Sequence, residues 1–315
     1  MAEFQTYSPE DVIAKNLAEA AIRQDRLAEQ ELAHLREWAE SIVNDGGQSP
    51  DFIASLSEHR MPRTVPATDT LSANTAKLTA LHRLQNVWKN VFLCTEIGER
   101  LRQKRELLPE SFFTENEELP EQARDRIAYQ RNSYADSAYL LFAKHLSAPR
   151  AVYSHNFQTV CEEVYNQSCE YCILPLENSA DGPLNSFFRL IERFELKIAA
   201  TCDIPTTDKS RTTRFALLRR NLSPLYAISS KHDRFFEFGL PSDADVKPAD
   251  VLYAAECCGL RLCRHASGMR QTDQAALRSD NFSVGADRGD LCTFLLFLAM
   301  EAPNYTPLGL YPHLN

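Results

Sequence analysis

Long hydrophobic runs are missing from this sequence of 315 residues, and so is a targeting leader. No segment reaches the roughly 20 consecutive apolar residues that a membrane-spanning helix needs. Met1–Phe4 does not open a basic segment followed by an apolar one, as a secretory signal peptide would. These two absences predict a soluble protein of the cytoplasm that makes no contact with a membrane.

Regularly spaced cysteines are missing as well. The nine cysteines follow no repeating pattern, and Cys257 and Cys258 are adjacent, which favours reduced thiols over a disulfide framework. Cys169 and Cys172 have the two-residue spacing of some metal and redox sites, but no second pair and no nearby histidine accompany them. The sequence therefore predicts buried thiols here and no metal site.

The sequence also lacks an excess of basic charge. It holds 34 Lys and Arg against 43 Asp and Glu, a formal net charge of −9, and both signs are mixed along the chain. This excludes nucleic acid as the main partner, whereas a small organic anion would need locally placed arginines. His155 and His265 near strand ends are read either as ligands or acid–base groups, or as structural residues.

Residues 1–120 read as helices. Ser8 and Pro9 form a favourable helix start, and an apolar stripe runs from there to a stop at Gly46. A short helix is predicted to begin at Ser49, and a second long stripe extends over residues 71–101. These helices can bury their apolar stripes only against one another or against another copy of the chain.

An acidic linker at residues 115–121 leads into a region where short apolar segments alternate with helical patterns. This alternation predicts an α/β lobe with a largely parallel sheet. The predicted strands are 127–129, 151–153, a segment from Tyr171, 197–202 and 214–218, and the predicted helices are 134–146, 157–166 and one opening at Gly182. The chain thus divides into a helical region (1–120), an α/β lobe (121–224) and a final domain (233–315).

The most informative stretch runs from Tyr171 to Gly182. An apolar run of strand length ends in Glu177, Asn178 and Ser179, and Gly182 opens a helical pattern. In an α/β unit such a polar turn lies at the carboxyl edge of the sheet, where ligands bind and where the next helix favours an anion. Alternatively, Asn178 and Ser179 only satisfy backbone groups of the turn.

Three motifs in this order resemble one enzyme family. They are Pro175-x-Glu177-Asn178-Ser179-x-x-Gly182, Thr213-Arg214-Phe215 and Leu308-Gly309-x-Tyr311-Pro312. They are similar to signatures of the prephenate dehydratase family, whose members make phenylpyruvate on the route to phenylalanine. The resemblance covers residues 126–315, and it implies one lobe of a periplasmic-binding-protein-like α/β domain followed by an ACT-like α/β sandwich.

The resemblance also implies a chemistry. Prephenate would lose its ring hydroxyl and CO2, with no metal or other cofactor. Thr213 would donate to the leaving hydroxyl, and Glu177 would assist catalysis. The residues predicted to bind the substrate, a small aromatic or cyclohexadienyl carboxylate, are Asn178, Ser179, Ser133, Arg131 and Arg214, although Arg131 can also be an exposed arginine without this role. A threonine hydroxyl is a weak acid, so this role needs a dry, preorganised site.

Three departures from the family pattern leave catalysis open. Only a loop, Thr201–Thr212, stands where the family inserts a second lobe, so one wall of the cleft is lost. The turn at residues 129–134 lacks the family's glycines and offers Arg131 instead. Segments 243–248 and 264–268 differ from the usual amino-acid-binding motifs of an ACT domain.

The final domain is predicted to contain strands at 235–238, 260–265 and 292–300 and a helix at 247–258. Residues 302–307 stand where a second helix is expected. The apolar run Phe294–Leu298 is interpreted as a strand that needs cover on both faces, which predicts a homodimer or larger assembly through this domain.

Two functions follow from these observations. The chain is either a prephenate-dehydratase-like enzyme, which completes its cleft with the N-terminal helices or a second subunit, or a non-catalytic descendant. The descendant would serve as an aromatic-ligand-binding regulator or a protein scaffold. The retained motifs at Glu177–Ser179 and Thr213–Phe215 favour the enzyme, and the missing lobe favours the descendant.

Overall fold

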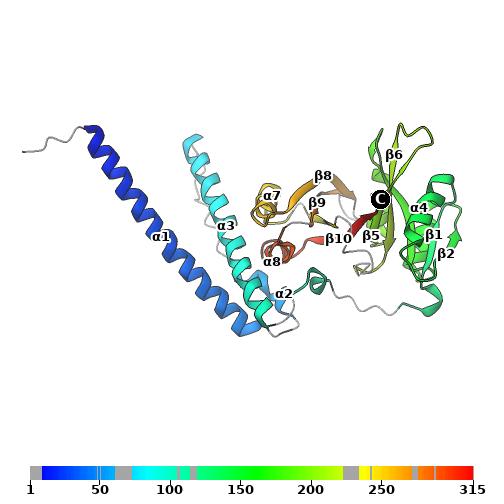
Figure 1. The fold of residues 1–315 in the computed structure, drawn as a ribbon, viewed down its shortest axis with the longest axis horizontal. Coiled ribbons are helices and arrows are strands. Elements are labelled where there is room, and N and C mark those ends of the chain that lie inside the picture. Colours follow the sequence, from blue (N-terminus) through cyan, green and yellow to red (C-terminus); the bar gives the residue numbers. More distant parts are fainter. Residues whose placement is uncertain are drawn as a thin grey trace, which may run out of the picture. The chain divides into compact units, whose positions relative to one another are not determined.

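The computed structural model describes residues 9–47, 49, 51–60, 73–104, 107–113, 119–222, 234–241, 243–271, 276–286 and 289–314. The chain divides into two compact units, one of Met1–Phe52 with Met61–Glu106 and one of Ile53–Arg60 with Leu107–Asn315 (Figure 1). Among the described helices, none is both long enough and apolar enough to span a bilayer. The predicted N-cap Ser8, residues 71–72 and linker residues 115–118 lie outside the described residues.

Two long helices form the first unit, and they run in the same direction. They are α1 (Pro9–Gly46) and α3 (Ala73–Lys104), and α1 has the predicted first residue and stops at the predicted glycine. Ion pairs join Glu31 to Lys89 and Arg36 to Glu96, so later residues of α1 meet later residues of α3. Apolar side chains are buried along the later halves of the two helices: they are Leu35, Ala39, Ile42, Val43, Val91, Leu93, Cys94, Ile97 and Leu101.

Short helical turns connect the larger elements. The short helix predicted from Ser49 begins three residues later, as α2 (Phe52–Ser55). The 3-10 turns are η1 (Leu56–His59), η2 (Pro109–Phe112) and η3 (Glu121–Ala123).

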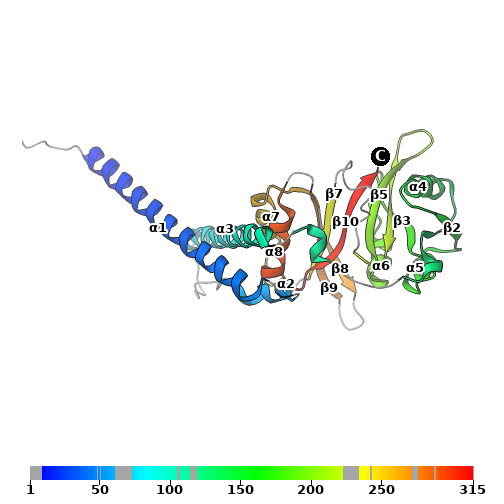
Figure 2. The same cartoon turned by 60° about the horizontal axis from the view of Figure 1, so that its bottom comes forward.

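One mixed sheet runs through the second unit, and ten strands are described in it (Figure 2). Its order is β2-β1-β3-β6-β5-β10-β7-β9-β8, with β4 paired to β3. The strands are β1 (Arg126–Tyr129), β2 (Arg150–Tyr153), β3 (Tyr171–Asn178), β4 (Gly182–Pro183), β5 (Lys197–Pro205), β6 (Thr212–Arg219), β7 (Arg234–Pro241), β8 (Arg261–Gln271), β9 (Ala276–Gly285) and β10 (Thr306–Leu314).

Fewer strands of the lobe's sheet are parallel than the sequence predicts. Strands β1, β2 and β3 are parallel, but β6 is antiparallel to both β3 and β5. Half of the predicted loop Thr201–Thr212 is strand, because β5 extends to Pro205 and β6 starts at Thr212. Only residues 206–211 connect them, and so short a connection permits a hairpin but no crossover to a parallel strand.

Helices cover both faces of this part of the sheet. On one face, here called the α4 face, α4 (Ser133–Ala143) packs Phe142 against a cluster that includes Tyr129 and Phe215. On the other, the α6 face, α5 (Phe157–Tyr165) and α6 (Asn185–Arg193) pack against Leu174 and Ala216.

Strand β10 joins the lobe to the last domain, because it lies between β5 and β7 (Figure 2). It is parallel to β5 and antiparallel to β7. Gly309 pairs with Ile198, and a Cβ atom on Gly309 would lie 2.6 Å from the Ile198 carbonyl oxygen. The glycine of the third motif therefore permits the close approach of these two strands.

The last domain has the order β7-α7-β8-β9-α8-β10, with strand order β10-β7-β9-β8. This order is that of a ferredoxin-like α/β sandwich. Its helices are α7 (Pro248–Cys257) and α8 (Leu291–Glu301). Strand β8 is longer than predicted, and β9 has no counterpart among the predicted elements.

The strand predicted at residues 292–300 is wrong, because this run is the helix α8. Every residue of α8 is buried, and Asp290 caps it by accepting the Thr293 N–H at 3.0 Å. A helix that is apolar all round carries no periodic signal, so the run resembles a buried strand. The second helix of the domain is expected at residues 302–307. It lies earlier in the chain and is α8. The side chain of Phe294 packs inside the domain against Phe238, so this run offers no strand edge to another subunit.

Candidate functional site

The polar residues of the motifs gather at one edge of the sheet. Strands β1 and β3 are parallel, so their carboxyl ends share that edge, and the antiparallel strand β6 begins there. Strands β5 and β10 end at the same edge. Asn178 is paired with Thr213 and Glu177 with Arg214, so the first two motifs are direct neighbours.

The predicted polar turn begins later than the sequence suggests. Glu177 and Asn178 are the last two residues of β3, and the turn itself consists of residues 179–181. Gly182 does not open a helix, because Gly182–Pro183 forms β4 and folds back on β3, and α6 starts at Asn185. Gly182 has a φ of 71°, a left-handed conformation that glycine adopts without strain.

The two predicted catalytic residues lie on opposite faces of the sheet. Side chains alternate along a strand, so Thr213 shares the α4 face with Phe215, and Arg214 shares the α6 face with Ala216. Paired residues of antiparallel strands point to the same side. Asn178 therefore accompanies Thr213 on the α4 face, and Glu177 accompanies Arg214 on the α6 face.

On the α4 face, part of the motif serves the turn. Ser179 Oγ accepts the Thr212 N–H at 2.9 Å, and Asn178 Oδ1 accepts the Ala180 N–H at 2.9 Å. The alternative that these side chains satisfy backbone groups of the turn therefore holds for these two oxygen atoms. The Asn178 side-chain NH2 group and the Thr213 hydroxyl make no hydrogen bond to any other described residue, so both can donate to a ligand at this edge.

Arg131 and Ser133 flank Asn132, the N-cap of α4. Arg131 precedes the cap, and Ser133 is the first residue of the helix. Asn132 Oδ1 accepts the N–H groups of Tyr134 and Ala135. The exposed Arg131 guanidinium lies 5.0 Å from the centre of the Tyr153 ring. Neither Arg131 nor Ser133 bonds to Asn178 or Thr213 in the described part of the chain, so the structure brings them to the same edge but not into one cluster.

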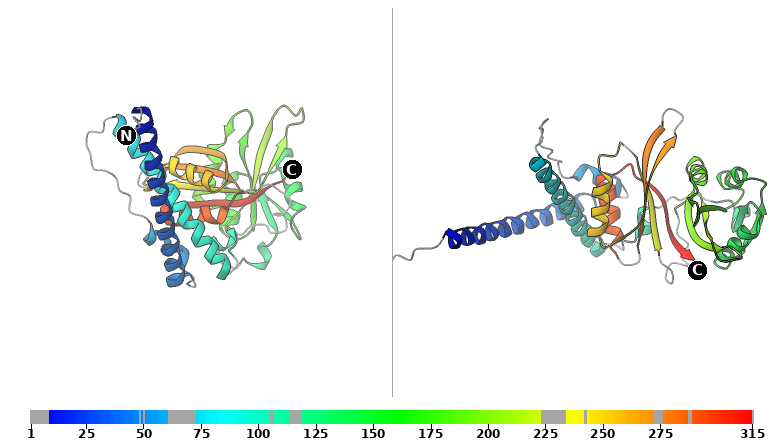
Figure 3. Two further views of the ribbon diagram at one scale, coloured as in Figure 1. Left: turned by 60° about the vertical axis from the view of Figure 1, so that its left-hand side comes forward. Right: turned by 90° about the horizontal axis from the view of Figure 1, so that it is seen from above.

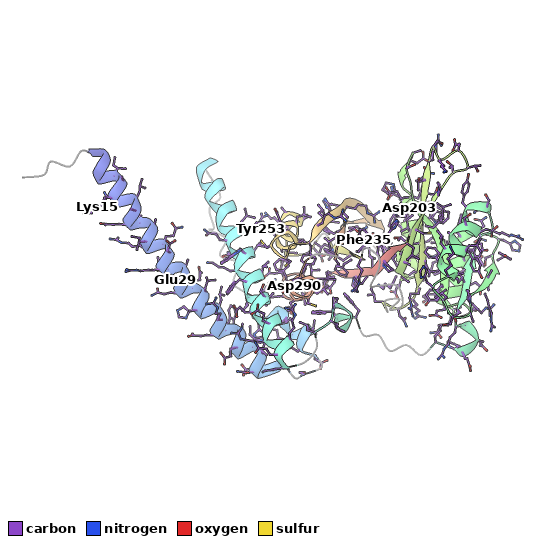
Figure 4. All side chains as sticks on the ribbon, in the orientation of Figure 1. Lys15, Glu29, Asp203, Phe235, Tyr253 and Asp290 are labelled. Atoms are coloured by element: carbon purple, nitrogen blue, oxygen red, sulfur yellow. The ribbon has the colours of Figure 1, made fainter. Side chains whose placement is uncertain are left out.

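A charged network occupies the α6 face, and we call it the Arg214 network. Arg214 binds Asp203 through two hydrogen bonds, Nε to Oδ1 at 2.9 Å and Nη2 to Oδ2 at 3.1 Å, and lies 3.7 Å from Glu177. His313 Nε2 lies 3.6 Å from Asp203, and His313 Nδ1 lies 3.0 Å from Thr201 Oγ1. Asp203 is labelled in Figure 4. Arg214 is thus held by Asp203 and does not present a free guanidinium to a substrate.

Sequence reasoning missed Asp203, Thr201 and His313. A usable signal was present, because Thr201 and Asp203 are polar residues two apart in an apolar strand and therefore share one face. Burial raises the pKa of Asp203, but hydrogen bonding and the charge of Arg214, with His313, outweigh it and hold that pKa below its usual value.

Asp203→Asn should lower the free energy of unfolding by about 1 kcal/mol at pH 7, since the pair is partly exposed and screened by solvent. The folded-state pKa of Asp203 is depressed, so its contribution is present above the unfolded pKa of about 3.9 and is lost as the pH falls through the lower folded value. Urea unfolding of both proteins between pH 7 and pH 2 measures this. Asp181→Asn in the exposed turn is the control, and equal effects at all pH values would contradict the prediction.

A second charged group lies on the strands of the last domain, and we call it the Glu237 group. Glu237 is 1% exposed, and its carboxylate accepts hydrogen bonds from Arg264 and, at 2.8 Å, from the Tyr311 hydroxyl. The Arg264 guanidinium lies 5.2 Å from the Phe188 ring of α6. Burial lowers the pKa of Arg264, but the charges of Glu237 and Glu177 offset this, and the net shift is upward. The group therefore connects the last domain to the α6 face of the lobe.

The histidines and cysteines have structural surroundings. His265 lies 3.2 Å from Asp280 and stacks on Phe282, and His155 is exposed. All nine cysteines are free, and burial raises the pKa of Cys169 to about 11. The described residues contain no group of three or more His, Cys, Asp or Glu arranged to hold a metal ion.

These features define an α/β protein whose sheet gathers polar side chains from β3 and β6 at one edge. Residues 127–209 match the family model described as prephenate dehydratase. This segment, about a quarter of the chain, is similar to the prephenate dehydratase family. The matched segment includes Glu177, Asn178 and Ser179 but ends before Thr213.

Solved structures that align with part of the chain include prephenate dehydratases. Prephenate dehydratase from Streptococcus mutans aligns with a TM-score of 0.49 and 20% identity over 60% of this chain and 99% of that one. The enzyme from Arthrobacter aurescens in complex with L-Phe aligns with a TM-score of 0.44 and 13% identity over 59% and 90%. GqqA, described as a novel type of quorum quenching acylase, aligns with a TM-score of 0.43 and 20% identity over 60% and 95%. No protein of curated function matches the chain.

Proposed function

We propose that this chain binds a small aromatic or cyclohexadienyl carboxylate at the α4-face edge of its sheet and does not dehydrate it as a single chain. The observation that carries the proposal is the pairing of Asn178 with Thr213. Both residues present hydrogen-bond donors that no described residue occupies, and hydrogen bonds to a charged acceptor are stronger than those to a neutral one.

Two features argue against turnover by one chain. Dehydration needs water to be excluded, but residues 206–211 form only a short loop at this edge, and Thr213 is half-buried. Glu177, the second candidate catalytic residue, lies on the opposite face beside Arg214. A weakly acidic hydroxyl without a nearby partner has little capacity for general acid catalysis.

The second candidate is prephenate dehydration, and the same pairing of Asn178 with Thr213 favours it. Both residues stand in the family's motifs, and in this fold they are direct neighbours on one face. In this case the missing wall of the cleft would come from a second copy of the chain or from its N-terminal helices.

The test combines binding with turnover. Calorimetry should detect binding of prephenate or phenylpyruvate to the purified full chain, and Thr213→Val or Asn178→Ala should weaken it about tenfold, the effect of one lost hydrogen bond. Thr212→Val is the matched control, because the neighbouring residue points to the other face. Phenylpyruvate formation is measured in parallel.

Each outcome selects one function. Binding that depends on Thr213, without phenylpyruvate formation, supports the proposal. Turnover that Thr213→Val abolishes supports the second candidate. A folded protein that neither binds nor converts these carboxylates would overturn both.

A further inference from the structure

No described residue of the first unit covers the first half of α1. Residues 13–30 are all exposed, including Ile13 at 58%, Leu17 at 67% and Leu27 at 66%. Helices α1 and α3 pair through their later halves and diverge toward their N-terminal ends (Figures 1 and 3). The exposed stretch 13–30 has 18 residues, and because a helix rises about 1.5 Å per residue it is about 27 Å long.

The exposed apolar side chains continue an existing interface. Ile13, Leu17, Ala20 and Leu27 follow helical spacing and fall on the same face as Leu35, which is buried in the seam with α3. Beside Leu35, α1 borders a pocket of about 540 Å3. It is lined by Leu27, Gln30, Glu31, His34, Leu35 and Trp38. The face that packs on α3 thus extends, without its partner helix, along the first half of α1.

The charges of this segment permit contact with an identical segment. Residues 13–30 carry three basic and three acidic side chains, Lys15, Arg23, Arg26, Glu19, Asp25 and Glu29, and are neutral overall, whereas the whole chain carries −9. Lys15 and Glu29, labelled in Figure 4, extend from this exposed part of the helix. A membrane-surface helix would instead show a strongly basic polar face.

We propose that the first half of α1 docks against the N-terminal helical unit of a second copy of this chain. The second copy presents the same exposed apolar face and the same pocket on α1, so each copy covers the other in a symmetric contact. The contact extends the α1–α3 seam by the same kind of apolar packing. It is independent of the ligand site, because no residue of the α4-face edge takes part.

The test uses the full chain and a pair of matched substitutions. Light scattering or sedimentation of the wild-type protein at micromolar concentration should give the mass of a dimer or a larger assembly. The double substitution Leu17→Glu with Leu27→Glu should raise the dissociation constant by about 100-fold or more, because it places two charges in an apolar contact. Ile22→Glu is the control, since Ile22 is 54% exposed but lies on the opposite side of α1, and it should leave the assembly intact.

The outcomes separate this proposal from the alternatives. A wild-type protein that is monomeric at these concentrations overturns it. An assembly that survives the double substitution, in a protein of unchanged helicity by circular dichroism, also overturns it and assigns association to another surface. A monomer whose thermal stability falls with the double substitution but not with Ile22→Glu means that the chain's own second unit covers the stripe, and this too overturns the proposal.

Discussion

Arg264→Met should lower the free energy of unfolding by about 3 kcal/mol at neutral pH, because it leaves a buried carboxylate without its counter-charge. Glu237 is 1% exposed and is held by Arg264 and the Tyr311 hydroxyl. After the substitution only the hydroxyl remains, and one neutral hydrogen bond cannot compensate for the desolvation of a charge. Urea unfolding at pH 7 measures the change.

A double-mutant cycle shows whether the effect comes from the buried charge. Glu237→Gln combined with Arg264→Met should recover a large part of the loss, since a neutral amide is less costly to bury than an unpaired carboxylate. Arg261→Met, at an exposed position of the same strand, should change stability by less than about 0.5 kcal/mol. A loss of similar size in the single and double variants would contradict the ion-pair explanation.

Phe294→Ala should destabilise the second unit by about 4 kcal/mol, the cost of removing a fully buried aromatic side chain. Phe294 is 0% exposed, and its ring centre lies 5.7 Å from that of Phe238 on β7. The cavity would open between α8 and Phe238 of the sheet. The measurement is the midpoint and slope of the urea transition.

Leu262→Ala provides the comparison for Phe294→Ala. Leu262 is an apolar residue of the same domain but is 45% exposed, so its truncation should cost less than about 1 kcal/mol. If both substitutions had the same small effect, α8 would not be the central core helix of this domain.

The helices and strands of the lobe could be predicted because the apolar patterns and the helix-capping residues of the sequence indicate the same elements. Residues 127–129 and 151–153 are short apolar segments, and Asn132 and Asn156 are strong N-caps that accept backbone N–H groups at the starts of α4 and α5. The helix α8 could not be recognised, because its uniform apolar sequence has neither the helical nor the strand period. Its cap, Asp290, was the one local sign of a helix.

The candidate site could be predicted in part. The motifs indicated that Asn178 and Thr213 meet, and they are paired neighbours. They did not indicate that Thr213 and Glu177 lie on opposite faces, because that depends on the exact end of β3 and on the hairpin register. The partner of Arg214 was also hidden, since Asp203 lies on β5 and becomes its neighbour only when the β5–β6 hairpin forms.

The position of β10 has a consequence for folding during synthesis. β10 is hydrogen-bonded to β5 on one side and to β7 on the other, and both of those strands precede it in the chain. Until β10 leaves the ribosome, two strand edges in the middle of the sheet have unpaired backbone groups, and such edges can pair with other chains. The lobe and the last domain therefore become one cooperative sheet only after β10 has been made.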